Sequence, residues 1–465
     1  MLILSSTALT DRVFMHTQCL RVLRSRAEVE IWSPSARAEQ YRSAWDVVDA
    51  RVRPMPPVGA LKEFPVNFLR RVNEAAWDAR QRARCRESMR RHSSNVGLLR
   101  RVQRAAGRVV ASLGQEQRLE DAIERMMLAA NRSPAAGELL ATNRPDLVLS
   151  TGPFQFVAPG ITALAQRSGI PVLAMVPSWD NLSTKNRLVL KYDGYIVWSE
   201  WQKEELHRYY PDSRRKPVYV VGAPQFDIFF DPRFHGPRES FLREQGLDPA
   251  RKTILYALGS PNLLPGEIFG ALDLARRVAD GRLGPVQMIV RPHPVFDRGE
   301  FQARFEGLRH VVVQHPAGES RVSERSQDET QAREWVNTFR HVDVVVNLSS
   351  TVTVDAAVLD RPVVNLNYDP APGAPQQQFI EEINASWEHF SPIAQSGGLW
   401  LSRDADETAL AVRTYLEQPE LHRERRRWIA ERVCQYLDGR CGERLADALL
   451  DFLSSPTAAE ASRGG

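Results

Sequence analysis

The sequence predicts an α/β protein made of two Rossmann-like domains. Two observations predict this fold class. Short apolar segments alternate with helical segments in two separate series, and a loop rich in Pro, Asp and Phe lies between the series near residue 225. Alternation at this spacing is typical of βαβ units, whose parallel strands form a sheet with helices on both faces. A chain of 465 residues is long enough for about two to four domains.

The first domain is predicted over residues 1–224. Strands are expected at short apolar runs: 2–4, 29–32, 147–150, 171–176, 195–199 and 218–222. Helices are expected between them, at 156–167 and 200–209. Residues 64–131 show little strand pattern, and apolar residues at helical spacing predict an insert of two helices there.

The second domain is predicted over residues 225–454. Its expected strands and helices again alternate: strands at 253–258, 287–290, 310–313, 342–347 and 362–365, helices at 265–279, 331–340 and 352–359. Two or three helices are expected between residues 404 and 453. The small, polar tail 455–465 is expected to be disordered. Two such halves predict a cleft between them, with ligands outside the carboxyl ends of the strands.

The charge balance and the cysteines exclude some classes of protein. The chain carries 61 basic and 57 acidic side chains, and a net charge of +4 does not predict nucleic-acid binding. The four cysteines form no C-x-x-C pair, so we expect free buried thiols in a reducing compartment. No segment approaches the ~18 apolar residues of a membrane-spanning helix, and a signal-peptide pattern is lacking. We therefore expect a cytoplasmic protein, with peripheral binding to the inner face of the membrane as an option.

The predicted helical insert is strongly basic. Between Arg70 and Arg108, twelve arginines oppose three acidic residues, which gives a net charge of +9. The plainest interpretation is a solvated helical face. A functional interpretation is a surface for anionic lipid headgroups or for an anionic lipid-linked acceptor. Nucleic acid is a weaker alternative, because no aromatic residues are interleaved with the charges.

The clearest candidate site follows the expected strand 342–347. Ser349, Ser350 and Thr351 stand where this strand turns into a helix, and hydroxyl and backbone N–H groups at a helix start favour a pyrophosphate. Asp355, one turn into the helix, is a candidate partner for a ribose hydroxyl. The alternative is an ordinary helix cap with an acid favoured by the helix dipole.

A second group of candidates follows two other strands of the second domain. An R-P-H-P turn comes directly after the expected strand 287–290. In it, Arg291 is suited to bidentate contact with phosphate, and His293 to phosphate binding or acid–base catalysis near neutral pH. Gly259 and Ser260 form a small loop that lets a phosphate approach backbone amides. A surface turn with incidental charge is the alternative.

The candidates for acceptor binding share a position in the loops of the first domain: Trp179, Asp180, Asn181, Lys185, Asp11 and His16. Trp179 is suited to stacking on a sugar or headgroup, Asp180 to taking a proton from an acceptor hydroxyl, and Lys185 to touching a phosphate. The alternative for Asp180 is a turn made by Asx side chains. Asp11 and His16 also fit a helix cap or a surface position.

The sequence predicts no metal and no cofactor. The histidines are scattered without H-x-H or H-E-x-x-H spacing, and no D-x-D triplet follows a strand. The G-x-G-x-x-G and P-loop patterns are lacking as well, which removes the main support for dinucleotide and P-loop interpretations. The missing D-x-D favours a metal-free two-domain design over a single-domain, metal-dependent glycosyltransferase.

These motifs carry a resemblance to a known family. Two Rossmann-like halves, the R-P-H-P turn and an S-S-T-x-x-x-D-A-A helix start resemble the GT-B glycosyltransferases, particularly bacterial surface-polysaccharide enzymes and the CDP-glycerol glycerophosphotransferase-like branch. The resemblance implies an acceptor at the first domain, with Asp180 near the cleft. It implies a nucleotide-activated donor at Gly259, Arg291, His293, Ser349–Thr351 and Asp355. The chain departs from the nucleotide-sugar 2-epimerases, whose catalytic acids find no match, and lacks the E-x(7)-E pattern of many retaining GT-B enzymes.

We therefore expect a metal-independent GT-B glycosyltransferase that moves a sugar from a nucleotide-sugar donor to a polysaccharide or lipid-linked acceptor. Closure at a hinge near residue 225 would exclude water from the donor. Asp180 would activate the acceptor if the reaction inverts. One alternative is transfer of a glycerol- or ribitol-phosphate unit from a CDP-alcohol, in which His293 has more than a phosphate-binding role. Another is a non-catalytic, nucleotide-binding partner subunit.

Overall fold

The computed structural model describes residues 1–46, 48, 50–92, 97–130, 133–154, 158–185, 187–315 and 328–455. These residues form two compact units, each built on one parallel sheet. Unit 1 comprises Met1–Asp227 and the C-terminal segment from Cys434, and unit 2 comprises the described residues from Ile228 to Val433. The predicted fold class of two Rossmann-like α/β domains is confirmed.

Unit 1 contains a seven-stranded parallel sheet in the order β3-β2-β1-β4-β5-β6-β7. Its strands are β1 (Leu2–Leu4), β2 (Glu30–Ser33), β3 (Arg51–Pro54), β4 (Val148–Ser150), β5 (Val172–Met175), β6 (Gly194–Val197) and β7 (Val218–Val220). The central strands β1, β4, β5 and β6 are buried along their whole length. Burial on both faces explains why they read as continuous apolar runs.

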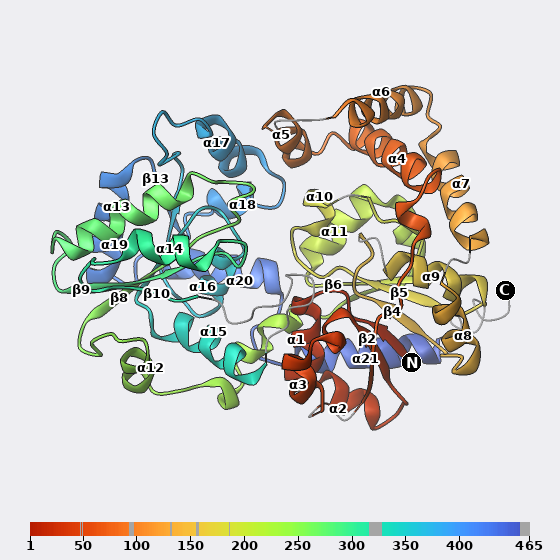
Figure 1. Cartoon of the computed structure of the whole chain (residues 1–465), viewed down its shortest axis with the longest axis horizontal. Helices are drawn as coiled ribbons and strands as arrows, with labels where there is room; N and C mark the ends of the chain where they lie inside the picture. The colour runs from red at the N-terminus through yellow and green to blue at the C-terminus, as the bar shows by residue number, and fades with distance from the viewer. Residues whose placement is uncertain are drawn as a thin grey trace. The chain divides into compact units, whose positions relative to one another are not determined.

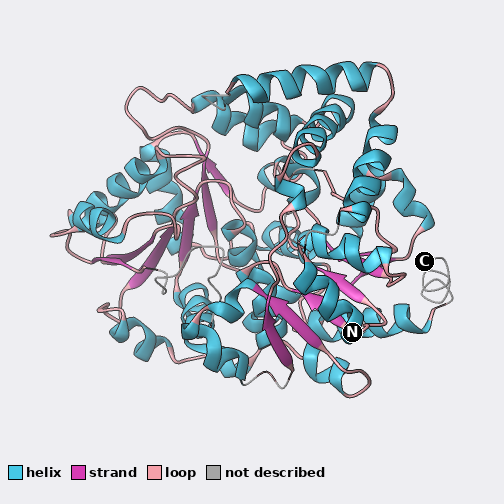
Figure 2. Ribbon diagram, turned by 45° about the vertical axis from the view of Figure 1, so that its right-hand side comes forward, coloured by secondary structure: helices cyan, strands magenta, loops and turns pink. Residues whose placement is uncertain are grey.

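Helices cover both faces of this sheet, as the cyan ribbons around the magenta strands show in Figure 2. They are α1 (Ala8–His16), α2 (Cys19–Arg24), α3 (Arg42–Asp46), α8 (Pro134–Thr142), α9 (Ala158–Arg167), α10 (Asn181–Thr184) and α11 (Glu200–Tyr209). Three of them begin where a hydroxyl caps the first turn, at Thr7, Ser133 and Ser199. Thr7 accepts from the backbone N–H of Thr10 at α1, and Ser199 accepts from that of Gln202 at α11.

The last helix, α21 (Cys441–Ser454), belongs to unit 1. Its residues Leu445, Leu449 and Phe452 are fully buried in the same core as the strands β1 and β4 and the helix α2, beside which α21 lies in Figure 1. The carboxylate of Asp227 accepts from the first backbone N–H groups of the helix, those of Cys441 and Gly442, at 3.1 and 2.7 Å. The prediction that the second domain continues to residue 454 is therefore wrong at its C-terminal end. Of the predicted tail, residues 456–465 lie outside the described residues.

In its described residues, the helical insert of unit 1 contains four helices rather than the two predicted: α4 (Val66–Gln81), α5 (Arg84–His92), α6 (Leu98–Ser112) and α7 (Glu116–Ala129). Two of the breaks between these helices fall at single residues with a left-handed backbone. Arg82 ends α4 in a left-handed conformation with φ 49°, and Gly114 follows α6 with φ 64°. Gly107 lets α6 lie against α4, because an added Cβ there would come within 2.5 Å of the Cβ of Ala75.

Unit 2 contains a six-stranded parallel sheet in the order β10-β9-β8-β11-β12-β13. Its strands are β8 (Lys252–Ala257), β9 (Val286–Arg291), β10 (Val311–Val313), β11 (Val344–Asn347), β12 (Val363–Leu366) and β13 (Trp400–Ser402). The strand order reverses between β8 and β11, and ligands of open α/β sheets bind at the carboxyl ends of such neighbouring strands.

The helices of unit 2 follow its strands in the pattern of βαβ units. They are α12 (Arg238–Glu244), α13 (Glu267–Ala279), α14 (Arg298–Phe305), α15 (Glu329–His341), α16 (Val352–Val358), α17 (Gln377–Ser386), α18 (Ser391–Ala394), α19 (Ala405–Glu417) and α20 (Arg423–Cys434). The predicted helices at 265–279, 331–340 and 352–359 correspond to α13, α15 and α16.

Two further expectations are tested directly. All four cysteines are buried and none of them forms a disulfide, as predicted. In the part of the chain that the structure describes, no helix combines the length and the apolar character that crossing a bilayer requires.

Candidate functional site

Three loops of unit 2 leave the carboxyl ends of the adjacent strands β9, β8 and β11. Gly259 and Ser260 follow β8, Arg291 is the last residue of β9, and Ser349 lies just after β11. Because parallel strands end at the same edge of their sheet, the structure brings these sequence-predicted donor residues to one edge. The edge includes the point between β8 and β11 where the strand order reverses.

The loops after β8 and β11 are fastened together by a carboxylate that the sequence analysis did not single out. Glu267, the first residue of α13, accepts from the backbone N–H groups of Gly259 at 2.8 Å and Leu348 at 2.9 Å. The side chain is 1% exposed. Burial raises the pKa of Glu267 to about 8, although both N–H donors favour the ionised form. In the sequence, an acid at a helix start indicates only a favourable dipole contact, so no signal marked it.

The loop between β11 and α16 holds its hydroxyls in an unexpected way. Ser349 has a left-handed backbone with φ 37°, and its Oγ donates to Oδ1 of Asn384 at 2.7 Å. The Oγ of Ser350 accepts from Nδ2 of Asn347 at 2.9 Å. Thr351 occupies the N-cap position but its side chain makes no capping hydrogen bond. The hydroxyls are therefore not used as simple helix caps, which was the alternative to an anion-binding role.

Arg291 is buried and held by three neighbours. It is 7% exposed, and its Nη1 donates to Oε1 of Gln314 at 2.5 Å and to Oε1 of Glu334 at 2.8 Å. Its guanidinium carbon lies 5.0 Å from the centre of the Trp335 ring. A planar guanidinium stacked on an aromatic ring is well ordered. The role of Arg291 in binding phosphate stays a prediction. The structure shows in addition that its side chain packs between Gln314, Glu334 and Trp335.

Asp355 lies in the first turn of α16 and is 4% exposed. Its Oδ1 accepts from Nε1 of Trp335 at 3.2 Å. Trp335 thus contacts both Arg291 and Asp355, so α15 is a part of this edge that the sequence did not mark. Trp335 and Glu334 lie in the predicted helix 331–340, and no sequence pattern marks them because their partners lie 20 and 43 residues away, respectively.

His293 and Ser260 occupy the turns of the same edge. Nδ1 of His293 accepts from the backbone N–H of Val295 at 3.3 Å, which places the proton of a neutral ring on Nε2. The carbonyl of Ser260 accepts from the backbone N–H groups of Leu263 and Leu264 at 3.0 and 3.1 Å. Both side chains are partly exposed. Their predicted contacts with a donor stay predictions.

In unit 1, Asp180 lies in the loop after β5 and is partly exposed. Its carboxylate accepts from Oγ of Ser178 at 2.5 Å, Nδ2 of Asn181 at 3.1 Å and Oγ1 of Thr184 at 2.9 Å. These contacts resemble the Asx turn that was the alternative interpretation. They also fix the carboxylate in one orientation, which a general base requires.

The neighbours of Asp180 differ in exposure. Trp179 is 4% exposed and packs against Trp201, with ring centres 6.2 Å apart, and Asn181 is 6% exposed. Burial makes Trp179 part of the core, which argues against stacking on an acceptor. Lys185 is exposed. The basic insert docks beside this loop, because Cys85 donates to the carbonyl of Ser183 at 2.9 Å.

Asp11 and His16 are not placed for acceptor binding. Asp11 is 1% exposed, and its carboxylate accepts from the hydroxyls of Ser5, Ser33 and Ser35 at 2.5, 2.9 and 2.5 Å. It fastens α1 to the ends of β1 and β2. His16 is 7% exposed and lies in the last turn of α1, at the opposite end of that helix from the carboxyl end of β1. Burial therefore argues against direct acceptor contact for both.

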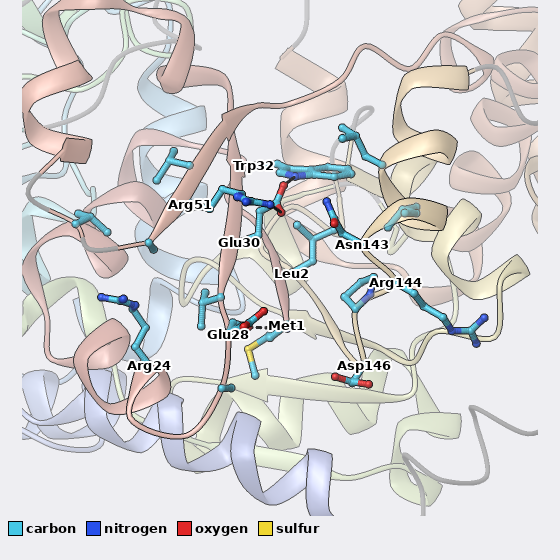
Figure 3. A pocket seen from close by; sticks show the side chains of 18 of the residues that line it. Met1, Leu2, Arg24, Glu28, Glu30, Trp32, Arg51, Asn143, Arg144 and Asp146 are labelled. Atoms are coloured by element: carbon cyan, nitrogen blue, oxygen red, sulfur yellow. Dashed lines mark hydrogen bonds and ion pairs between the residues drawn. The ribbon is translucent and has the colours of Figure 1, made fainter.

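A cavity of about 1600 Å³ opens elsewhere in unit 1, at the amino ends of β1, β2 and β3. Figure 3 shows Arg24, Glu28, Arg51, Arg144 and Asp146 around it. The predicted site residues do not line it. Among the described residues, no three His, Cys, Asp or Glu side chains gather as a metal site would require.

Two parallel-sheet units of this topology define the GT-B type of fold. A family model matches residues 169–451, more than half of the chain. The chain belongs to this family, described as CDP-glycerol:poly(glycerophosphate) glycerophosphotransferase. No curated protein shows significant sequence similarity to the chain.

Solved structures share the fold at low identity. The S. aureus MnaA–UDP structure has a TM-score of 0.56 at 10% identity and covers 97% of this chain and 96% of its own. UDP-GlcNAc 2-epimerase from Neisseria meningitidis, bound to UDP-GlcNAc, has a TM-score of 0.55 at 12% identity, covering 97% and 100%. The wall teichoic acid polymerase TagF, soaked with CDPG, has a TM-score of 0.50 at 10% identity, covering 97% and 88%.

Proposed function

We propose that the chain transfers a group from a nucleotide-activated donor, bound by unit 2, to an acceptor hydroxyl of a cell-surface polymer. The observation that carries this proposal is the convergence of Gly259, Arg291 and Ser349 at one edge of the sheet, beside the reversal of strand order. The guanidinium of Arg291 suits a diphosphate at such an edge, as do loop N–H groups other than those of Gly259 and Leu348, which Glu267 holds.

Family membership favours transfer of an alcohol phosphate from a CDP-linked donor. In this reaction the acceptor oxygen attacks the β-phosphorus and forms a new P–O bond. The bond from that phosphorus to the bridging oxygen breaks, and CMP leaves with the electron pair. The acceptor proton goes to a base. Charge develops on phosphate oxygens, which cationic and N–H groups stabilise.

Sugar transfer, the function expected from the sequence, is the second candidate. The fold neighbours that hold UDP or UDP-GlcNAc favour it. Here the acceptor oxygen attacks the anomeric carbon, the bond from that carbon to the phosphate oxygen breaks, and a nucleoside diphosphate leaves.

The residue roles proposed are the same in both reactions. Asp180 takes the acceptor proton, since Ser178 and Thr184 hold its carboxylate in one orientation. His293 donates from Nε2 to a donor phosphate oxygen, and Arg291 supplies positive charge beside it. With its ring nitrogen Nδ1 already accepting from Val295, His293 is suited to donating rather than to accepting a proton.

The released nucleotide distinguishes the two reactions. The full chain is incubated with CDP-glycerol, CDP-ribitol, UDP-GlcNAc or GDP-mannose and a polymer acceptor, and the nucleotides are separated by chromatography. Release of CMP that depends on the acceptor supports phosphate transfer, and release of UDP or GDP supports sugar transfer. Donor binding without release of any nucleotide favours the non-catalytic partner subunit.

We also propose that the basic insert binds an anionic membrane surface. Helix α6 buries Gln103 and Gly107 but exposes a stripe of apolar side chains at helical spacing. The stripe comprises Leu98 (79% exposed), Leu99 (62%), Val102 (49%), Val109 (58%) and Leu113 (65%). An amphipathic helix with its apolar face uncovered and arginines alongside is typical of interfacial membrane binding.

The arginines beside this stripe support an anionic partner. Among the described residues of the stretch 70–108, the arginines that pair with carboxylates of the insert include Arg70, Arg71, Arg80, Arg86 and Arg90. On α6, burial and the nearby Arg71 lower the pKa of Arg100, and burial and the nearby Arg90 lower the pKa of Arg104. Anionic headgroups would relieve this repulsion between like charges.

A further inference from the structure

Glu267 occupies the point in unit 2 where the strand order reverses. Its α13 follows β8 in the chain, while the second loop that it contacts follows β11, some 80 residues later. One carboxylate oxygen accepts from Gly259 N–H and the other from Leu348 N–H, at 2.8 and 2.9 Å. A single buried side chain therefore sets the distance between the two loops.

The contact requires a side chain with two oxygens. One oxygen of the carboxyl group faces the N–H of Gly259 and the other faces the N–H of Leu348, so both backbone N–H groups have an acceptor. An amide presents one oxygen and one NH2 group, which would leave one N–H facing another donor. The fit at Gly259 is close as well, because an added Cβ there would lie 3.3 Å from Oε2 of Glu267.

The second loop has a strained backbone at the residue that follows this contact. Ser349, with φ 37°, comes directly after Leu348. Its backbone is fixed on one side by the Leu348–Glu267 bond and on the other by the bond from its Oγ to Asn384. A left-handed serine persists where its surroundings hold it, and such residues are frequent in binding sites.

We propose that Glu267 is a positioning residue, which sets the loop at Gly259 and Ser260 against the loop at Ser349–Thr351 in the arrangement that receives the donor diphosphate. This inference rests on the proposed function, since it assumes that these loops bind the donor. Glu267 itself is buried beneath the loops and acts through their backbone.

A merely structural contact would stabilise unit 2 without affecting donor binding, and the chain offers a matched control for this. Asp343 joins the same two strands, β8 and β11, at their amino ends, opposite to the donor loops. There its Oδ2 accepts from the backbone N–H of Thr253 at 2.8 Å. Asp343→Asn removes charge from a carboxylate between β8 and β11 without touching the donor loops.

The test compares wild type, Glu267→Gln, Glu267→Asp and Asp343→Asn in full-length protein. Titration calorimetry measures the affinity for CDP and UDP, and thermal unfolding and circular dichroism monitor the fold. We expect Glu267→Gln to weaken nucleotide diphosphate binding at least about tenfold while the protein stays folded. Asp343→Asn should lose thermal stability and bind like wild type. Glu267→Asp, which keeps the carboxyl group but is one methylene shorter, should also bind weakly and serves if Glu267→Gln does not fold.

Two results would overturn the inference, and they can be told apart. If folded Glu267→Gln and Glu267→Asp bind CDP and UDP as wild type does, Glu267 is not a positioning residue, although the proposed function stands. If wild type itself binds neither nucleotide, the donor site at this edge fails and the inference fails with it.

Discussion

The guanidinium of Arg291 stacks on the ring of Trp335 at 5.0 Å, and Nε1 of Trp335 donates to Asp355. One side chain of α15 therefore joins the loop after β9 to the helix after β11. The two strands are not neighbours, because β8 lies between them in the sheet. Substitutions at Arg291 and at Asp355 therefore both remove a contact of Trp335.

Replacing Arg291 with Ala is expected to weaken donor binding. Loss of a charge-assisted hydrogen bond to phosphate costs about 1.5–3 kcal/mol, which corresponds to roughly 10- to 150-fold in affinity. Lys185→Ala, in an exposed loop of unit 1, should change donor affinity by no more than about twofold. Titration calorimetry of both variants checks this difference. If folded Arg291→Ala binds donor as tightly as wild type, Arg291 serves only the packing with Gln314, Glu334 and Trp335.

Asp355→Asn is expected to lower nucleotide affinity while the fold is kept. Asn retains an oxygen that accepts from Trp335, but it loses the negative charge offered to a ribose hydroxyl and the ~0.3–1 kcal/mol that the helix dipole contributes. Trp335→Phe is the matched variant, because it removes the hydrogen bond and leaves the carboxylate. A loss of thermal stability in Asp355→Asn with unchanged nucleotide affinity would show that Asp355 is only a structural residue.

Asp180→Asn tests the proposed base. We expect the turnover rate to fall by about 10²- to 10⁴-fold, the range for general base catalysis, with donor affinity unchanged. Ser178→Ala removes the 2.5 Å hydrogen bond to the carboxylate but keeps the base, so it should reduce turnover less. Steady-state rates of nucleotide release give the comparison. Equal rates for Asp180→Asn and wild type would contradict the role of Asp180.

The stability of unit 2 is expected to depend on pH through Glu267. Burial raises the pKa of this carboxyl to about 8, whereas its ordinary value is 4.5. The folded state therefore binds the proton more tightly, and this contribution to stability is complete below about pH 4.5 and is lost as pH rises toward 8.

Glu267→Gln does not titrate, so its unfolding free energy should fall less steeply with pH than that of wild type. Asp227, whose pKa burial raises to about 6, has lost most of its own contribution by pH 6.5. Urea unfolding of both proteins at pH 6.5, 7.5 and 8.5 measures this difference, and the difference between their slopes isolates Glu267, at no more than about 1.4 kcal/mol per pH unit. Parallel curves for wild type and Glu267→Gln would contradict the raised pKa.

Membrane binding is expected to need both the apolar stripe and the arginines of α6. Wild type should float with vesicles that contain acidic lipid at low salt, and binding should weaken as salt shortens the Debye length. Leu99→Gln with Val109→Gln should weaken flotation, as should Arg100→Gln with Arg104→Gln, at about 1 kcal/mol for each arginine near the surface. Donor affinity should not change. If the protein does not float with acidic vesicles at low salt, the insert is a solvated surface that binds no membrane.

Much of the fold could be predicted because its central strands are short apolar runs with clear ends. The strand β3, which reads R-V-R-P, escaped prediction since it lies at the sheet edge and pairs its charges with the neighbouring strand, as Arg53 does with Glu30 at 2.9 Å. The return of α21 to unit 1 could not be predicted either. An amphipathic pattern shows that a helix buries one face, but not which sheet it covers.

The candidate site was predicted where residues follow strands directly, since the carboxyl ends of parallel strands meet at one edge. Contacts between distant parts of the chain carried no sequence signal. Trp335 and Glu267 appear as ordinary helix residues until the structure places Asp355 and Leu348 against them. Trp179 shows the opposite error, because an aromatic residue in a polar loop suggested stacking on a ligand and the structure buries it.

Unit 2 is proposed to bind the diphosphate of a nucleotide-activated donor, and thermal unfolding with a panel of nucleotides measures this binding. Wild type, Arg291→Ala and Asp180→Asn are each heated with CDP, UDP, CDP-glycerol, UDP-GlcNAc and GDP-mannose. A nucleotide at 100 times its Kd stabilises the folded state by about 2.7 kcal/mol. We predict that at least one nucleotide raises the Tm of wild type and of Asp180→Asn, and that Arg291→Ala loses this increase. No increase with any nucleotide, or an increase that Asp180→Asn alone loses, would contradict the account.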